Sequence, residues 1–136
     1  MFWADNSAAK VVSRNMDWAV SDEPELWSLP AALVRQGNAE PNSHTWTSSY
    51  ASVAVSMWNL GTVDGMNDQG LAAHTLYLEN AGWEAVDARP AVANTVWAQY
   101  VLDNFDTVAA VVDAVSAVRI ASIPVRGRQL GVHPCG

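Results

Sequence analysis

The sequence contains a single cysteine, Cys135, among its 136 residues. One cysteine cannot close an internal disulfide, and it leaves no cysteine cluster that could hold a metal. The three histidines, His44, His74 and His133, are far apart, and none belongs to an HExxH motif or to a comparable ligand spacing. We therefore expect neither a metal nor a cofactor.

Long apolar runs and an excess of basic residues are also missing. No apolar stretch reaches the roughly 18 residues that a membrane-spanning helix requires. The residues after Met1 lack the basic segment and apolar run of a signal peptide, and the compartment stays open between cytoplasm and periplasm. The 14 acidic residues outnumber 7 lysines and arginines, giving a formal net charge of -7. This charge argues against nucleic acid or an anionic membrane as a partner.

Apolar and aromatic residues are abundant by contrast. Half of the residues are hydrophobic, and seven are tryptophan. A chain of this length is expected to form one domain with a buried core. Large aromatics buried in a sheet core would explain the tryptophan count, and so would aromatics exposed in an incomplete fold.

Strand patterns dominate the first half of the chain. Lys10 to Ser13 is short and β-rich, and residues 26–34 are apolar but contain Pro30, which predicts an edge strand or a bulge. Residues 45–58 alternate between two faces that are both mostly apolar or small, which predicts one central strand. Turns are predicted at Gly61 and Asp64-Gly65 and again over residues 67–70, followed by a strand over residues 71–78.

Helical spacing appears in the second half. Pro90 can open a first helix, whose apolar positions are Val92, Val96, Trp97, Tyr100 and Val101. Asp106 is predicted to cap a second helix. Its apolar stripe, predicted to pack in the core, is Val108, Val111, Val112, Val115 and Val118. A further strand is predicted to start in residues 123–132. Strands followed by two helices are typical of one layer pair of a larger sandwich.

Two motifs carry a resemblance to a known family. They are Ser13-Arg14-Asn15-Met16-Asp17-Trp18 and Gly65-Met66-Asn67-Asp68-Gln69-Gly70-Leu71. Both resemble the choloylglycine hydrolase and penicillin V acylase family, and residues 96–105 add a third similar stretch. The resemblance runs from Trp3 to about His133 but covers only the N-terminal part of the family's domain. It implies an α+β fold, the N-terminal part of the αββα sandwich of N-terminal nucleophile hydrolases.

The resemblance also implies a nucleophile. Mature members of the family begin with a cysteine, whose thiol attacks the amide while its α-amine, with an ordinary pKa of about 7.7 to 8.0, handles the proton. Here that cysteine would fall just upstream of Met1, and we expect the intact gene product to contain it. An oxyanion-hole asparagine and a second arginine of the family would lie beyond Gly136. Cys135 has no α-amine partner and is not expected to replace the nucleophile.

Three residues of this sequence occupy functional positions of the family. Arg14 and Asp17 match its catalytic arginine and aspartate, where a guanidinium favours the thiolate and a carboxylate holds the α-ammonium. An ordinary ion pair or turn contact between Arg14 and Asp17 stays open as the alternative. Tyr77 matches a substrate-pocket position near the oxyanion hole, where its hydroxyl could donate to the oxyanion. A core tyrosine is the alternative there.

Two classes of function follow. The first is a truncated amidase whose intact form hydrolyses a small-molecule linear amide, such as a conjugated bile salt, penicillin V or an acyl homoserine lactone. The second is a non-catalytic binding or interaction module that keeps the pocket without the nucleophile. Because an incomplete sandwich leaves sheet edges unpaired, we expect the isolated chain to be a homo-oligomer or poorly soluble.

Overall fold

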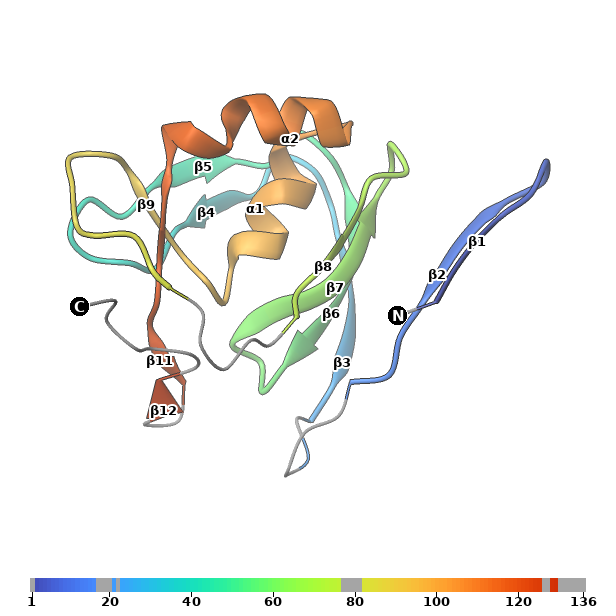
Figure 1. Cartoon of the computed structure of the whole chain (residues 1–136), viewed down its shortest axis with the longest axis horizontal. Helices are drawn as coiled ribbons and strands as arrows, with labels where there is room; N and C mark the ends of the chain where they lie inside the picture. The colour runs from blue at the N-terminus through green and yellow to red at the C-terminus, as the bar shows by residue number, and fades with distance from the viewer. Residues whose placement is uncertain (1, 17–20, 22, 77–81, 126–127, 130–136) are drawn as a thin grey trace.

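The computed structural model describes residues 2–16, 21, 23–76, 82–125 and 128–129 (Figure 1). Its strands are β1 (Phe2–Asp5), β2 (Lys10–Ser13), β3 (Glu25–Leu29), β4 (Val34–Gln36), β5 (Thr45–Thr47), β6 (Ser52–Met57), β7 (Gly61–Asn67), β8 (Ala72–His74), β9 (Ala91–Ala93), β10 (Arg119–Ala121), β11 (Pro124–Val125) and β12 (Arg128–Gln129). Its helices are α1 (Trp97–Asn104), α2 (Val108–Ala114) and the 3-10 turn η1 (Val115–Ala117). This mixture confirms the α+β expectation.

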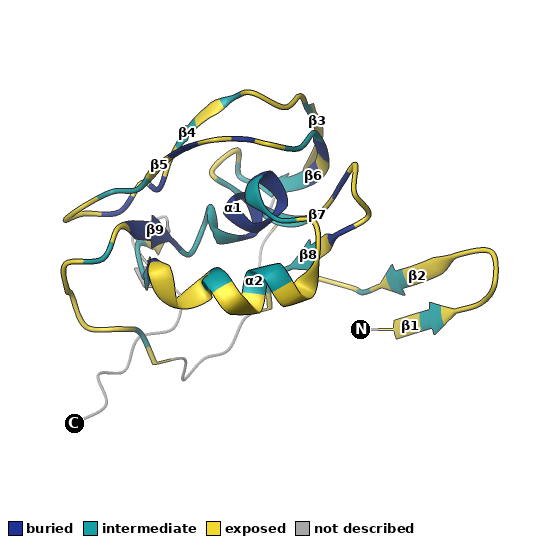
Figure 2. Cartoon of the chain, turned by 90° about the horizontal axis from the view of Figure 1, so that it is seen from above, coloured by how far each residue is buried: buried dark blue, intermediate teal, exposed yellow. Residues whose placement is uncertain are grey.

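The largest sheet is antiparallel, with the strand order β3-β6-β7-β8. One row of cross-strand neighbours is Trp27, Ala54, Gly65 and Ala73. The adjacent row is Leu26, Val55, Asp64 and His74. Because side chains alternate along a strand, the two rows point to opposite faces. Helix α1 covers the face that contains Gly65 and lies between this sheet and strands β4, β5 and β9 (Figures 1 and 2). The Asp64 row therefore lies on the face turned away from α1.

Gly65 lets α1 approach the sheet closely. A Cβ at this position would lie 2.6 Å from Leu102 Cδ1 and 2.9 Å from the carbonyl oxygen of Val53. Leu102 is completely buried and cannot move aside without disturbing the core. The turn predicted at Asp64-Gly65 is therefore wrong: both residues lie within β7, and the turn before this strand occupies residues 58–60.

We expect Gly65→Ala to lower the free energy of unfolding by about 1 to 3 kcal/mol, the usual cost of an overpacked core. The measurement is the urea or thermal unfolding midpoint. Gly82→Ala is the matched control, because a Cβ at Gly82 meets no atom within 4 Å. Equal midpoints for the two variants would contradict the close approach of α1.

An aromatic cluster fills the space on the other side of α1. It contains Trp46, Val92, Tyr100 and Val118, and the rings of Trp46 and Tyr100 meet edge to face with centroids 5.1 Å apart. Burial raises the pKa of the Tyr100 hydroxyl. Small residues fill a neighbouring cluster around the parallel pair of β9 and β10. The aromatic cluster thus joins Tyr100 of α1 to Trp46 of β5 and Val92 of β9.

A buried polar network fixes α1 from within. The Asp103 side chain is 1% exposed. Its carboxylate accepts hydrogen bonds from Trp46 Nε1 at 2.8 Å and Gln99 Nε2 at 2.7 Å, and it lies 3.4 Å from Arg35 Nε. Gln99 in turn accepts a hydrogen bond from Thr62 Oγ1 at 2.8 Å. The network therefore links α1 to β4, β5 and β7.

The helix predicted to open at Pro90 begins later than expected. Residues Ala91–Ala93 form β9 instead, pair in parallel with β10 and are fully buried. The helix begins at Trp97 and ends at Asn104. Pairing with β10, a strand that the sequence pattern did not indicate, outweighs the helical spacing of Val92 and Val96.

The valine stripe of α2 does not pack in the core, so this prediction is wrong. None of the α2 residues is buried, and Val108 and Val112 are 68% and 65% exposed. Val118 is buried, but it follows the end of the helical segment. The N-cap is Thr107 rather than Asp106, since Thr107 Oγ1 accepts a hydrogen bond from the backbone N–H of Ala110. Figure 2 shows α2 on the outside of the molecule.

Several strand predictions of the first half are confirmed. Strand β2 has the predicted bounds, and β3 is an edge strand that ends before Pro30. The single central strand predicted over residues 45–58 is wrong: these residues divide into β5 and the inner strand β6, and between them the buried Ser48 accepts a hydrogen bond from the Leu33 N–H. The turn over residues 67–70 is confirmed, with Gly70 at a φ of +82°. Of the strand predicted over residues 71–78, β8 forms Ala72–His74. Short strands β11 and β12 pair within residues 123–132.

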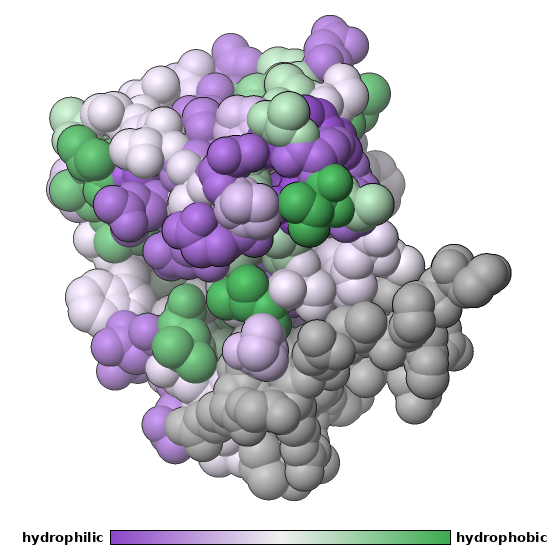
Figure 3. All heavy atoms as spheres, turned by 90° about the vertical axis from the view of Figure 1, so that its left-hand side faces the viewer, coloured by the Kyte–Doolittle hydropathy of each residue, from purple (hydrophilic) through white to green (hydrophobic). Residues whose placement is uncertain are grey.

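The surface includes two groups of exposed large apolar side chains, on the β1–β2 hairpin and on the sheet face opposite α1. They are Phe2, Trp3, Val11, Leu26, Val53 and Met66. The side of the molecule in Figure 3 carries hydrophobic residues as separate spots among hydrophilic ones. Within the described ranges, no helix is long and apolar enough to cross a membrane.

Candidate active site

The β1–β2 hairpin brings the start of the chain close to Arg14. The two strands are antiparallel, and Phe2 lies directly opposite Ser13, the residue before Arg14. The Asn6 side chain closes the turn by accepting hydrogen bonds from the backbone N–H groups of Ala8 and Ala9. The hairpin extends away from the rest of the molecule (Figures 1 and 2). Arg14 lies at its base, where the chain returns to the four-stranded sheet.

The guanidinium of Arg14 is held by β7 and by Thr75, the residue that follows β8. Its Nε lies 2.9 Å and 3.0 Å from the two carboxylate oxygens of Asp64, and its Nη2 lies 2.6 Å from Asp64 Oδ2. Nη1 donates to the carbonyl oxygen of Thr75 at 2.6 Å, and Nη2 donates to that of Val63 at 3.3 Å. The Arg14 side chain is only 9% exposed. Such a two-point pairing fixes the plane of the guanidinium.

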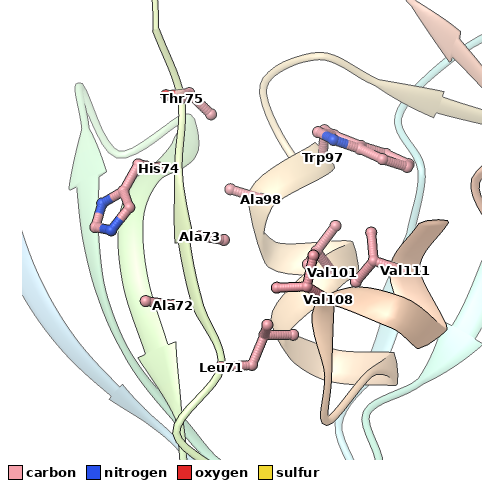
Figure 4. Close-up of a pocket in the computed structure, with 10 residues that line it drawn as sticks. All are labelled: Leu71, Ala72, Ala73, His74, Thr75, Trp97, Ala98, Val101, Val108 and Val111. Carbon is pink, nitrogen blue, oxygen red and sulfur yellow. The ribbon is translucent and has the colours of Figure 1, made fainter. Parts of the chain in front are cut away.

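Asp64 also contacts His74, its cross-strand neighbour on β8. His74 Nδ1 lies 2.6 Å from Asp64 Oδ1. Figure 4 shows His74 on the side of β8 turned away from α1, the side on which Asp64 lies. His74 Nε2 is buried and has no hydrogen-bond partner among the described residues. One carboxylate therefore orients both a guanidinium and an imidazole.

The cluster leaves Arg14 with unused donor capacity. A guanidinium has five N–H donors, and among the described residues Nη1 has only one acceptor, the Thr75 carbonyl oxygen. The remaining N–H on a fixed cation suits a thiolate or a developing oxyanion. In the described part of the chain, no three His, Cys, Asp or Glu residues lie close enough to hold a metal ion.

One of the three predicted site residues belongs to the described part of the chain. Arg14 is described, whereas Asp17 and Tyr77 lie outside the described residues, so the roles expected for them stay predictions. The sequence reasoning missed Asp64 and His74 as neighbours of Arg14. Alternation along β7 and β8 would have placed these two side chains on one face, but Asp64 was assigned to a turn.

A second feature is an apolar groove between β8 and the two helices (Figure 4). It has a volume of about 200 Å³. Its lining residues are Leu71, Ala72, Ala73, His74, Thr75, Trp97, Ala98, Val101, Val108 and Val111. Ala73 points from β8 towards α1, opposite to His74. Most of the groove therefore lies on the other side of β8 from Arg14 and Asp64.

Comparisons with known proteins identify the family of this chain. Residues 1–133 match the family described as linear amide C-N hydrolases, choloylglycine hydrolase family. A penicillin V acylase of Pectobacterium atrosepticum is 41% identical over 106 residues, covering 72% of this chain and 28% of that protein. The solved penicillin V acylase of Agrobacterium tumefaciens has a TM-score of 0.75 and 35% identity, covering 85% of this chain and 43% of that chain.

Two solved variants of conjugated bile acid hydrolase from Clostridium perfringens share the fold, with TM-scores of 0.61 and 0.64 at 23% and 22% identity. Each comparison covers 81% of this chain and 35% of that chain. The chain thus spans less than half the length of these relatives. The family match over nearly every residue shows that this chain belongs to the choloylglycine hydrolase family of linear amide C-N hydrolases.

Proposed function

We propose that residues 1–136 form the N-terminal, incomplete part of a cysteine-type N-terminal nucleophile amidase, whose cysteine lies a few residues before Met1. The observation that carries this proposal is the register of the β1–β2 hairpin, in which Phe2 pairs with Ser13. A segment continuing β1 backwards would run alongside the residues that follow Ser13. A cysteine in that segment would therefore lie near the guanidinium of Arg14.

The chemistry follows from this placement. The α-amine takes the proton of the cysteine thiol, and the thiolate attacks the amide carbonyl. The C–N bond then breaks as the α-ammonium gives that proton to the leaving amine, and water hydrolyses the resulting thioester to release the acid and the thiol. Arg14 stabilises the thiolate because its charge is fixed by Asp64 and two backbone carbonyls. Asp17 holds the α-ammonium, and Tyr77 donates to the oxyanion.

The substrate class is a small N-acyl amide. The relatives described above are named for penicillin V and for conjugated bile acids. Both names denote compounds in which an acyl group is joined to an amine through a linear amide. Conjugated bile salts, penicillin V and acyl homoserine lactones are therefore the substrates to test.

The αββα sandwich of this enzyme class agrees with the two faces of the main sheet. Helix α1 covers one face, while the other face presents Leu26, Val53 and Met66, which are 74%, 49% and 55% exposed. An exposed apolar sheet face needs a covering layer. In our proposal, that layer is a second sheet formed with the remaining part of the domain.

We expect Arg14→Ala and Asp17→Ala each to lower turnover by about 100- to 1000-fold, the usual effect of removing one preorganised electrostatic partner of the reacting atoms. The test measures amide hydrolysis by the gene product that includes the N-terminal cysteine. The unfolding midpoint is measured in parallel, so that loss of activity is separated from loss of fold.

Arg89→Ala is the matched control, because Arg89 pairs with Glu84 and Asp87 at the surface, away from the cluster. This variant should keep wild-type turnover. If Arg14→Ala and Asp17→Ala also keep it, both residues are structural and their catalytic assignment is wrong.

A further inference from the structure

Among the described residues, the Arg14 side chain makes the hydrogen bonds that join the β1–β2 hairpin to the rest of the molecule. Between described residues, every hydrogen bond and ion pair of residues 2–13 stays within the hairpin, as in the contact of Lys10 with Asp5. Arg14 is the first residue after β2 that bonds to the sheet, and it does so at Val63, Asp64 and Thr75. The position of the hairpin therefore depends on how firmly Arg14 is held.

Asp64 contributes most of that hold. Three N···O contacts of Arg14 reach the Asp64 carboxylate, at 2.6, 2.9 and 3.0 Å. These contacts join opposite charges, whereas those to Val63 and Thr75 reach neutral backbone carbonyls. The Asp64 side chain is 25% exposed, so the pair is partly shielded from solvent. Charge-assisted, two-point pairs of this kind are stronger and more directional than neutral hydrogen bonds.

His74 restrains Asp64 in turn. Its Nδ1 lies 2.6 Å from Oδ1, while Oδ2 accepts the shortest contact from Arg14. Because Asp64 and His74 are direct cross-strand neighbours, the sheet itself sets the distance between them. The carboxylate is thereby held by His74 on one side and pairs with Arg14 on the other.

We propose that Asp64, restrained by His74, is the positioning residue that orients Arg14 and so anchors the base of the N-terminal hairpin to the sheet. This inference rests on the proposed function, because the hairpin is the element that would bring the cysteine to the site. Asp64 itself does not contact the reacting atoms in this proposal. It acts through Arg14 by orienting the guanidinium N–H that has no acceptor among the described residues.

Limited proteolysis with trypsin tests the proposal on the 136-residue chain, without any nucleophile. Trypsin must draw an arginine or lysine side chain into its specificity pocket, so cleavage after Arg14 requires the Asp64 pair to open. In Asp64→Asn, an uncharged amide faces Arg14. Its NH2 group is a hydrogen-bond donor and cannot accept the N–H groups of the guanidinium. We expect cleavage after Arg14 to become roughly 10- to 100-fold faster.

Other cleavage sites in the same molecule serve as controls. Lys10 is 75% exposed in its side chain and should be cleaved at the same rate in both proteins. Arg119 is buried, so its cleavage reports general unfolding. Asp68→Asn makes the same chemical change in the exposed turn after β7 and should leave cleavage after Arg14 unchanged. His74→Ala should accelerate cleavage after Arg14 by a smaller factor than Asp64→Asn does.

The outcomes separate the alternatives. Selective acceleration after Arg14 supports a positioning role for Asp64. Unchanged cleavage after Arg14 overturns it, and so does equal acceleration after Arg14 and Arg119, which would make Asp64 a general structural residue. In the gene product with its cysteine, Asp64→Asn should lower kcat while KM stays nearly constant. If that protein has no amidase activity but the proteolysis result holds, the proposed function fails and the positioning role stands.

Discussion

The 136-residue chain on its own is expected to hydrolyse no conjugated bile salt, penicillin V or acyl homoserine lactone at a measurable rate. Met1 offers a thioether, which cannot lose a proton, and Phe2 has no nucleophilic group at all. Loss of a nucleophile removes the covalent route and lowers turnover by about a millionfold in enzymes that depend on one. The measurement is release of the free amine from each substrate.

The gene product that includes the N-terminal cysteine is the positive control and should be active. Cys135→Ala in the 136-residue chain is the second control, since Cys135 is the one cysteine in this sequence. Hydrolysis by the 136-residue chain that disappears in Cys135→Ala would show that the nucleophile is assigned to the wrong end of the protein.

Local patterns predicted those parts of the fold that local chemistry controls. The turn over residues 67–70 depends on Gly70 at positive φ and on Asn67, whose side-chain oxygen accepts hydrogen bonds from the N–H groups of Gln69 and Leu71. These preferences belong to the residues themselves. Strand β2 was similarly evident from its composition.

Tertiary contacts decided the elements that were predicted wrongly. Asp64-Gly65 has the composition of a turn, but Gly65 is required where Leu102 of α1 meets β7. The valines of α2 have core spacing, yet this helix lies on the outside. Spacing shows that an apolar stripe exists but does not show what covers it.

The candidate site was likewise predicted from the sequence only in part. Arg14 was found through a motif, because its neighbours in sequence are distinctive. Asp64 and His74 come close to Arg14 only through the pairing of β7 with β8 and through the return of the hairpin to the sheet. No spacing between residues 14, 64 and 74 could have indicated that contact.

Asp103→Ala is expected to lower the free energy of unfolding by about 3 to 5 kcal/mol, the usual cost of removing one partner of a buried charge pair. The substitution leaves Trp46 Nε1 and one Gln99 amide hydrogen without their acceptor, and it deprives Arg35 of its counter-ion. Because all of these groups are buried or partly buried, solvent cannot fully replace the lost contacts. The urea unfolding midpoint, monitored by tryptophan fluorescence, measures the loss.

Asp113→Ala is the matched control, since Asp113 lies on α2 and is exposed. It should shift the midpoint little, because alanine is a better helix former than aspartate and no buried partner is lost. The unfolding midpoint of Asp103→Asn should lie between those of Asp103→Ala and Asp113→Ala. Its amide oxygen can still accept one hydrogen bond, but the charge opposite Arg35 is gone. Since Asp103 lies on α1 and contacts β4 and β5, its loss should loosen the helix that covers β7. Equal midpoints for Asp103→Ala and Asp113→Ala would mean that the aromatic cluster alone holds α1, and that the polar network adds no stability to this fold.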